Sequence, residues 1–101
     1  MMYIYNVSIK IAYAIEGEWI KWMKEEHMDE VIATGMFDSY LFYELVDPIS
    51  DDGKTFVAQY FTDSKERYEM YIEKFAPLLR QKGYDKYGNQ FIAFRTIMKT
   101  C

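Results

Sequence analysis

The chain has 101 residues and a net charge of −4 at pH 7; half of its residues are hydrophobic and 19% are aromatic. This length fits one domain with one core, so we expect a single domain over residues 1–101. Lys and Arg number 12 against 16 Asp and Glu, and they form no basic stripe. This charge pattern argues against nucleic acid and against an anionic membrane surface as partners.

Cysteine and histidine usage limits the chemistry of the chain. Cys101 is the only cysteine, so no internal disulfide can form, which fits a reducing compartment. With a single histidine, His27, there are too few ligands for zinc, and we expect no metal and no cofactor. The chain begins with no secretory leader, and its apolar runs are far shorter than the roughly 20 residues that cross a bilayer. We therefore expect a cytoplasmic protein.

The first half of the chain predicts a strand, a helix and a second strand. Side chains alternate over residues 3–13, which predicts a half-buried strand whose core face carries Tyr5, Val7 and Ile9. A three- and four-residue period predicts a helix over residues 16–34, and Gly35 suits its left-handed C-terminal cap. Residues 36–46 are rich in Phe, Tyr and Leu and predict the second strand.

Residues 55–61 predict a third strand, with Phe56, Ala58 and Tyr60 on its core face. The segment that separates it from the second strand contains turn residues and is too short for a crossover helix. The second and third strands are therefore expected to form an antiparallel hairpin.

The last part of the chain predicts a helix and a strand. Asp63 or Ser64 can cap the helix. Pro77 should kink or restart it, and Gly83 should end it. Residues 91–98 alternate and predict a strand. Its core face would carry Ile92, Phe94 and Met98. The opposite, outward face would carry Phe91, Ala93, Arg95 and Ile97.

The order strand, helix, strand, strand, helix, strand predicts an α+β fold of the ferredoxin-like βαββαβ kind. Right-handed crossovers place the first and third strands in the middle of a four-stranded antiparallel sheet, with two helices on one face. The other face would combine large apolar side chains with a polar patch of Asn6, Ser8, Gln59 and Arg95. It is too apolar to face water, so we predict a homodimer through this uncovered face, as in a dimeric α/β barrel.

Five residues are candidates for binding a small ligand: His27, Trp22, Asn6, Gln59 and Arg95. His27 lies on the inner stripe of the first predicted helix, either as a proton-transfer group or as an imidazole that satisfies the core. Trp22 can stack on a ligand or fill the core. Arg95 lies among apolar strand residues and needs a partner, either a ligand carboxylate or an acidic residue of the same or a partner subunit.

Several segments together resemble an uncharacterised bacterial family of about this length, a domain of unknown function. They are WIKWMKEEH at 19–27, ATGMF at 33–37, QYF at 59–61, APLL at 76–79 and AFRT at 93–96. More widely, the chain resembles the dimeric α/β-barrel superfamily, which includes cofactor-free antibiotic-biosynthesis-type monooxygenases and haem-degrading monooxygenases. Haem-degrading members of that superfamily use an Asn on the first strand and a Trp and a His on the second helix, and by this resemblance Asn6 lies in a comparable strand. Here both Trp and the His belong to the first predicted helix, which argues against haem degradation.

Two hypotheses for the function follow. The first is a non-catalytic dimeric module that binds a small ligand or a protein partner, which accounts for the aromatic content. The second, implied by the resemblance, is a cofactor-free monooxygenase or isomerase for a small aromatic or polyketide-like substrate. In that enzyme His27, Asn6, Gln59 or Arg95 would orient the substrate or move a proton. An enclosed cavity with His27 or Arg95 pointing into it favours the enzyme.

Overall fold

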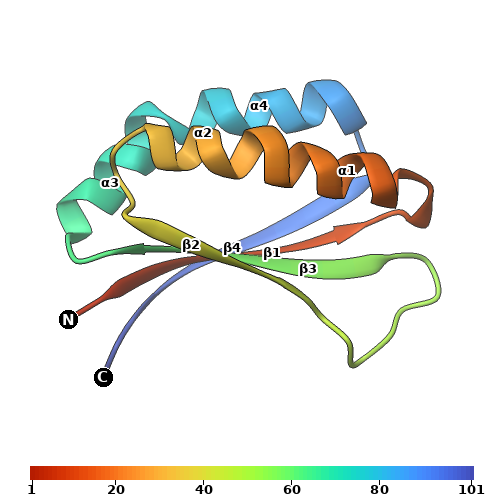
Figure 1. Ribbon diagram of the computed structural model, residues 1–101, viewed down its shortest axis with the longest axis horizontal. Helices are drawn as coiled ribbons and strands as arrows, with labels where there is room; N and C mark the ends of the chain where they lie inside the picture. Colours follow the sequence, from red (N-terminus) through yellow and green to blue (C-terminus); the bar gives the residue numbers. More distant parts are fainter.

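The computed structural model describes all 101 residues as one four-stranded antiparallel sheet covered by helices on one face (Figure 1). The strands are β1 (Tyr3–Ile11), β2 (Ser39–Glu44), β3 (Lys54–Thr62) and β4 (Phe91–Lys99), in the spatial order β2-β3-β1-β4. The central position of β1 and β3 and the single helical layer confirm the predicted ferredoxin-like α+β fold. None of the helices is long and apolar enough to span a bilayer.

The first helical segment is interrupted by a wider turn that the sequence did not predict. After a 3₁₀ turn at Tyr13–Ile15 (η1), the chain forms α1 (Glu16–Trp22), a π-helical turn at Met23–His27 (η2) and α2 (Met28–Ala33). Gly35 follows with a φ of 78°, which confirms the predicted left-handed cap. The π-helical turn ends at His27, and turns of this kind are frequent at functional sites.

The second helical segment restarts at its proline, as predicted. The Ser64 hydroxyl accepts a hydrogen bond from the Arg67 backbone N–H (3.2 Å) at the start of α3 (Lys65–Lys74). Pro77 then lies in the first turn of α4 (Ala76–Tyr87). The prediction that Gly83 ends this helix is wrong, because α4 continues for another turn to Tyr87, with Gly88 as its C-cap. Gly83 instead lies against the neighbouring layer: a Cβ there would be 3.5 Å from the Phe91 ring.

The pairing of β4 with β1 corrects the predicted orientation of the last strand. Arg95 lies opposite Val7, and Ala93 lies opposite Ile9. Because Val7 and Ile9 are buried under the helices, Arg95 and Ala93 face the helices too. The residues predicted to face the core point to the uncovered face instead: Ile92, Phe94 and Met98. Both faces of this strand are apolar, so alternation alone does not distinguish them.

The predicted core faces of the two central strands are confirmed. Tyr5, Val7 and Ile9 of β1 are buried, and so are the predicted core residues of β3, which are Phe56, Ala58 and Tyr60. An aromatic cluster joins these strands to the helices, since the Tyr5 ring lies 5.8 Å from Phe37 and 5.6 Å from Tyr71 between centroids. Aromatic pairs at such distances stabilise a core beyond their buried area.

Gly53 marks a close approach between chain segments, and we expect its substitution to be costly. A Cβ at Gly53 would lie 2.5 Å from the main-chain oxygen of Ile11. Gly53→Ala should therefore lower the free energy of unfolding by about 2 kcal/mol. Gly17→Ala is the matched control, because nothing lies within 4 Å of its added methyl group on α1, and it should stabilise by about 0.5–1 kcal/mol. Urea denaturation measures both, and equal effects would contradict the tight packing at Gly53.

Candidate functional site

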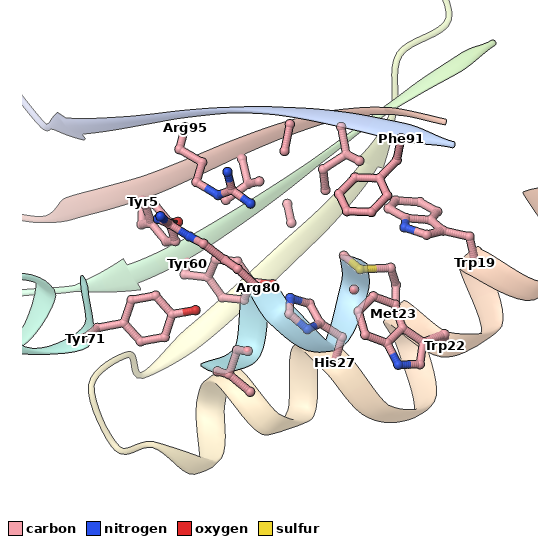
Figure 2. Close-up of a pocket in the computed structure, with 16 residues that line it drawn as sticks. Tyr5, Trp19, Trp22, Met23, His27, Tyr60, Tyr71, Arg80, Phe91 and Arg95 are labelled. Atoms are coloured by element: carbon pink, nitrogen blue, oxygen red, sulfur yellow. Dashed lines mark hydrogen bonds between the residues drawn. The ribbon is translucent and has the colours of Figure 1, made fainter. Parts of the chain in front are cut away.

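A cavity of about 60 Å³ lies between the sheet and the helices (Figure 2). Twelve of its sixteen lining residues are hydrophobic. Its volume exceeds the roughly 10–15 Å³ that one water needs and is smaller than a cavity of about 150 Å³ that holds benzene. The polar groups at its wall are few, and each comes from a different element. They are Tyr5 of β1, His27 of η2, Tyr60 of β3, Tyr71 of α3, Arg80 of α4 and Arg95 of β4.

The structure divides the five predicted ligand-binding residues between the two faces of the sheet. His27, Trp22 and Arg95 line the cavity. Asn6 and Gln59 point to the uncovered face, where the Gln59 Nε2 donates a hydrogen bond to the Asn6 Oδ1 (3.1 Å). The predicted polar patch that included Arg95 is therefore wrong, because it depended on the reversed orientation of β4. A ligand-binding role for the five residues stays a prediction.

His27 is held against Trp22 with one ring nitrogen unsatisfied. The two rings stack with centroids 4.7 Å apart and an interplanar angle of 24°. Nδ1 of His27 is buried and has no hydrogen-bond partner. Burial lowers the pKa of His27 to about 4; Glu30 opposes this shift, and Arg95 and Lys82 add to it. The imidazole is thus neutral at pH 7 and can exchange a hydrogen bond with a ligand.

The lowered pKa of His27 predicts a loss of stability in mild acid. The unfolded chain binds a proton on this imidazole below pH 6.5, whereas the folded chain keeps it neutral down to about pH 4. Between these values the unfolded state holds more protons, so His27 should remove up to about 1.4 kcal/mol of unfolding free energy per pH unit as pH falls. Above pH 6.5 it should contribute no pH dependence.

Urea denaturation between pH 7.5 and 4.5 measures this effect, with His27→Gln as the control that lacks the titrating group. The control should lose only the part of the pH slope that His27 supplies, because the carboxylates remain. An imidazole that titrates near pH 6.5 in NMR spectra of the folded protein would contradict the lowered pKa.

Arg80 is a cavity residue that the sequence analysis missed. Its Nη2 donates a hydrogen bond to the Tyr5 hydroxyl (3.0 Å), and its Nε is buried without a partner. Arg80 follows the buried Ala76 by four residues and precedes the buried Gly83 by three, so it lies on the inner stripe of α4. A cation is uncommon on the inner stripe of a helix, and here the Arg80 side chain lines the cavity.

The positive charges of Arg80 and Arg95 both act on the hydroxyl of Tyr71. Burial raises the pKa of Tyr71 well above its ordinary value, Tyr5 adds to the shift, and the charges of Arg80 and Arg95 oppose it. Burial likewise raises the pKa of Tyr60. Both phenols stay protonated at neutral pH and can donate hydrogen bonds into the cavity.

A comparison with known families finds that the model of a domain of unknown function (DUF4286) matches residues 2–101. No curated protein matches the sequence.

Several solved structures share the fold. A protein of the ethyl tert-butyl ether (ethd) family from Bacillus halodurans is 9% identical, with a TM-score of 0.74 and coverage of 100% of each chain. A protein from Nitrosomonas europaea described as an antibiotic biosynthesis monooxygenase is 12% identical (TM-score 0.68; 98% of this chain and 89% of that one). SnoaB from Streptomyces nogalater, a cofactor-independent oxygenase, is 7% identical (TM-score 0.63; 97% and 92%). At these identities the likeness shows the fold alone.

Proposed function

This chain belongs to the DUF4286 family, a domain of unknown function, and from its site we propose that it is a single-domain, homodimeric module that binds a small organic molecule in the cavity. The observation that carries the proposal is the pair of buried nitrogens left without partners at the cavity, Nδ1 of His27 and Nε of Arg80. Folded proteins rarely leave such atoms unpaired. An apolar cavity with a few convergent polar groups is typical of a ligand site.

The uncovered face supports the homodimer. We use this name for the sheet surface opposite the helices, and its exposed apolar side chains come from the two edge strands: Leu41 and Tyr43 of β2, and Ile92, Phe94 and Met98 of β4. They flank the polar pair of Asn6 and Gln59 on the two central strands, and exposed apolar side chains gathered on one face often mark an interface between proteins. A second copy would cover this surface with an identical one about a two-fold axis. We place the protein in the cytoplasm, where the exposed thiol of Cys101 would stay reduced.

A cofactor-free oxygenase or isomerase is the second candidate. Its support is the neutral His27 at the cavity, which can take a proton from a substrate, together with Arg95, which can stabilise the anion formed. The shared fold includes a cofactor-independent oxygenase. An aromatic substrate needs more room than about 60 Å³, so this function requires the cavity to widen.

The first proposal is tested with a library of small organic molecules of up to about six non-hydrogen atoms, which matches the cavity volume, and binding is followed by NMR on the ¹⁵N-labelled protein. We expect some fragments to shift signals of Trp22 and His27, and His27→Ala to fold normally but bind them more weakly. Leu78→Ala is the control, since Leu78 is exposed on α4 and does not line the cavity. A library that leaves every cavity signal unmoved would contradict the proposal.

The enzyme candidate has a separate test. Oxygen uptake with a polyphenolic substrate and no added cofactor should be measurable with the wild type and lost in His27→Ala. Equal uptake by both proteins would exclude the proton-transfer role of His27.

A further inference from the structure

The two arginines of the cavity have no acidic partner. Arg80 comes from α4 and Arg95 from β4, and both line the cavity. The six ion pairs of the structure use other cations, which are Lys10, Lys54, Arg67 and Lys82. Because the neighbouring His27 is neutral at pH 7, the cavity wall carries two positive charges. Both arginines are half-buried, and taking a charge even partly out of water without a compensating partner costs free energy.

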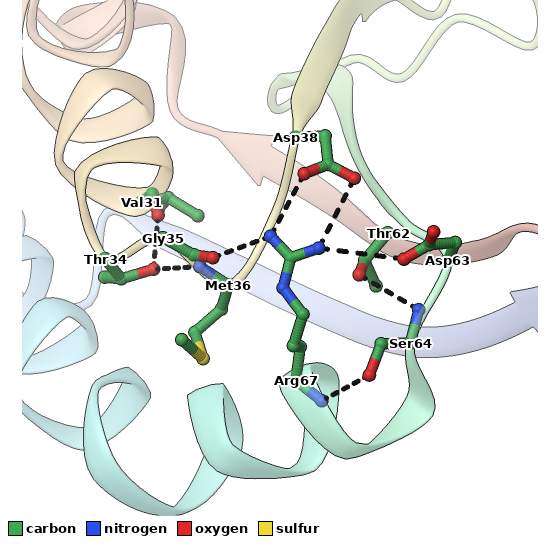
Figure 3. A network of polar contacts seen from close by, with 9 residues as sticks. All are labelled: Val31, Thr34, Gly35, Met36, Asp38, Thr62, Asp63, Ser64 and Arg67. Carbon is green, nitrogen blue, oxygen red and sulfur yellow. Dashed lines mark hydrogen bonds and ion pairs between the residues drawn. The ribbon is translucent and has the colours of Figure 1, made fainter.

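Arg67 shows how this chain satisfies an arginine that serves the fold (Figure 3). Its guanidinium donates to the Gly35 carbonyl oxygen (2.6 Å) and to Asp38 (3.0 Å), and lies 3.7 Å from Asp63. It thereby ties the end of α2 to the start of α3. Neither cavity arginine has a comparable set of acceptors, so stabilising the fold does not explain them.

No acidic residue lines the cavity, and the one that acts on His27, Glu30, is already paired. Glu30 raises the pKa of His27 against the effect of burial, but its carboxylate forms an ion pair with Lys82. It therefore does not neutralise the two arginines.

The two positive charges converge on one part of the cavity. Both oppose the raised pKa of the same buried group, the Tyr71 hydroxyl. In Figure 2, Arg95 points from β4 toward the helices, and Arg80 reaches toward Tyr5. The Tyr5 hydroxyl accepts one hydrogen bond from Arg80 (3.0 Å) and so positions its guanidinium, while Nε keeps a free hydrogen.

We propose that the cavity binds a short oxo- or hydroxy-carboxylate, with the carboxylate between Arg80 and Arg95. This inference rests on the proposed ligand-binding function and names the chemical class of the ligand. Guanidinium groups match a carboxylate with paired, charge-assisted hydrogen bonds. His27 is placed to exchange a hydrogen bond with the oxo or hydroxy oxygen through its unpartnered Nδ1.

The cavity wall selects a short organic anion over larger or inorganic ones. Its volume of about 60 Å³ accepts roughly three or four carbons, well below an aromatic ring. The apolar side of the wall, with Phe91 and Ala93 among its members, suits an alkyl tail. Phosphate and sulfate would gain nothing from that side, so they should bind more weakly than the organic acid.

Matched carboxylate and amide pairs test the ligand class: propionate with propionamide, pyruvate with pyruvamide, and lactate with lactamide. Each is titrated into the ¹⁵N-labelled full chain while the Nε–H signals of both arginines and the His27 ring are followed by NMR. We expect pyruvate and lactate to shift these signals and to bind at least about 10-fold more tightly than their amides. Inorganic phosphate serves as a further probe.

The outcomes separate this inference from the proposed function. If the amides bind as tightly as the acids, the carboxylate class is wrong, while a ligand-binding cavity stands. If phosphate binds more tightly than every carboxylate, the organic class is wrong. If no probe moves a cavity signal, this inference is overturned, and the fragment screen then decides the proposed function independently.

Variants assign the contacts. Arg80→Gln and Arg95→Gln should each weaken pyruvate binding about 10- to 100-fold. Arg95→Lys keeps the positive charge but loses the planar guanidinium that makes paired hydrogen bonds, so its affinity for pyruvate should lie between those of Arg95→Gln and the wild type. Tyr5→Phe should weaken binding less, because Tyr5 only positions Arg80. Lys65→Gln is the control, an exposed cation without an ion pair, and should bind as wild type. Wild-type affinity in both glutamine variants, each with a native NMR spectrum, would overturn the arginine clamp.

Discussion

Replacing Phe94 with lysine is expected to convert the protein from a dimer into a monomer. The Phe94 side chain is 65% exposed in the single chain and lies on the uncovered face. In a two-fold symmetric dimer the substitution occurs twice, and each lysine would be buried without a partner. At about 2 kcal/mol for each copy, the dimer dissociation constant should rise about 1000-fold. Sedimentation velocity at micromolar concentration measures the change.

Leu78→Lys is the matched control for this experiment. Leu78 is 69% exposed, almost the same as Phe94, but it lies on α4 rather than on the uncovered face. The control should remain dimeric, which separates an effect of position from a general effect of added charge. A wild-type protein that sediments as a monomer, or a Phe94→Lys variant that stays dimeric, would contradict the proposed interface.

Replacing Arg95 with methionine is expected to stabilise the fold and to abolish carboxylate binding. Methionine keeps most of the apolar length of the side chain and removes a positive charge that has no acidic partner. The free energy of unfolding should rise by about 1 kcal/mol, which corresponds to a Tm increase of about 4–8 °C for a domain of this size. Calorimetry and pyruvate titration of the same protein measure the two effects.

The opposite signs of the two effects distinguish a binding residue from a structural one. Arg67→Met is the control, since its guanidinium is held by Asp38 and the Gly35 carbonyl oxygen; it should lower the Tm and leave pyruvate binding unchanged. A Tm decrease for Arg95→Met comparable to that of Arg67→Met would show that Arg95 supports the fold.

The elements that were predicted correctly are those whose two faces differ in chemistry. β1 alternates between buried residues such as Val7 and polar ones such as Asn6, so its orientation follows from the sequence. The restart at Pro77 follows from the missing backbone N–H of proline. These signals are local, and tertiary packing did not override them.

The predicted orientation of β4 was wrong for a physical reason. Its residues facing the helices and those on the uncovered face are both apolar, as Ala93 and Phe94 illustrate, so no period-two contrast marks the core. Arg95 was predicted to face outward because it alternates with Phe94 and Met98, which were predicted to face the core. A charged side chain is seldom placed under helices, and the cavity accommodates Arg95 there.

The candidate site was predicted only in part. His27 was predicted because it recurs with the helical period on the inner stripe. Trp22 was predicted for its aromatic ring alone, since it precedes His27 by five residues and does not share that period. Arg80 was missed because a cation on a helix is ordinarily assigned to solvent. The cavity arises from packing between distant segments, and the π-helical turn that ends at His27 has no periodic signature.

Alternate residues of strand β4 lie on the uncovered face and at the cavity. Phe94 and Arg95, for example, are neighbours in the chain that point to opposite sides of the sheet. Subunit association and ligand binding therefore share one piece of backbone. A thermodynamic linkage between the two equilibria is the consequence: diluting the protein should weaken its affinity for the ligand. Saturating ligand should in turn tighten the dimer by the square of the factor by which dissociation weakens each site, because such coupling is reciprocal and each subunit carries one cavity.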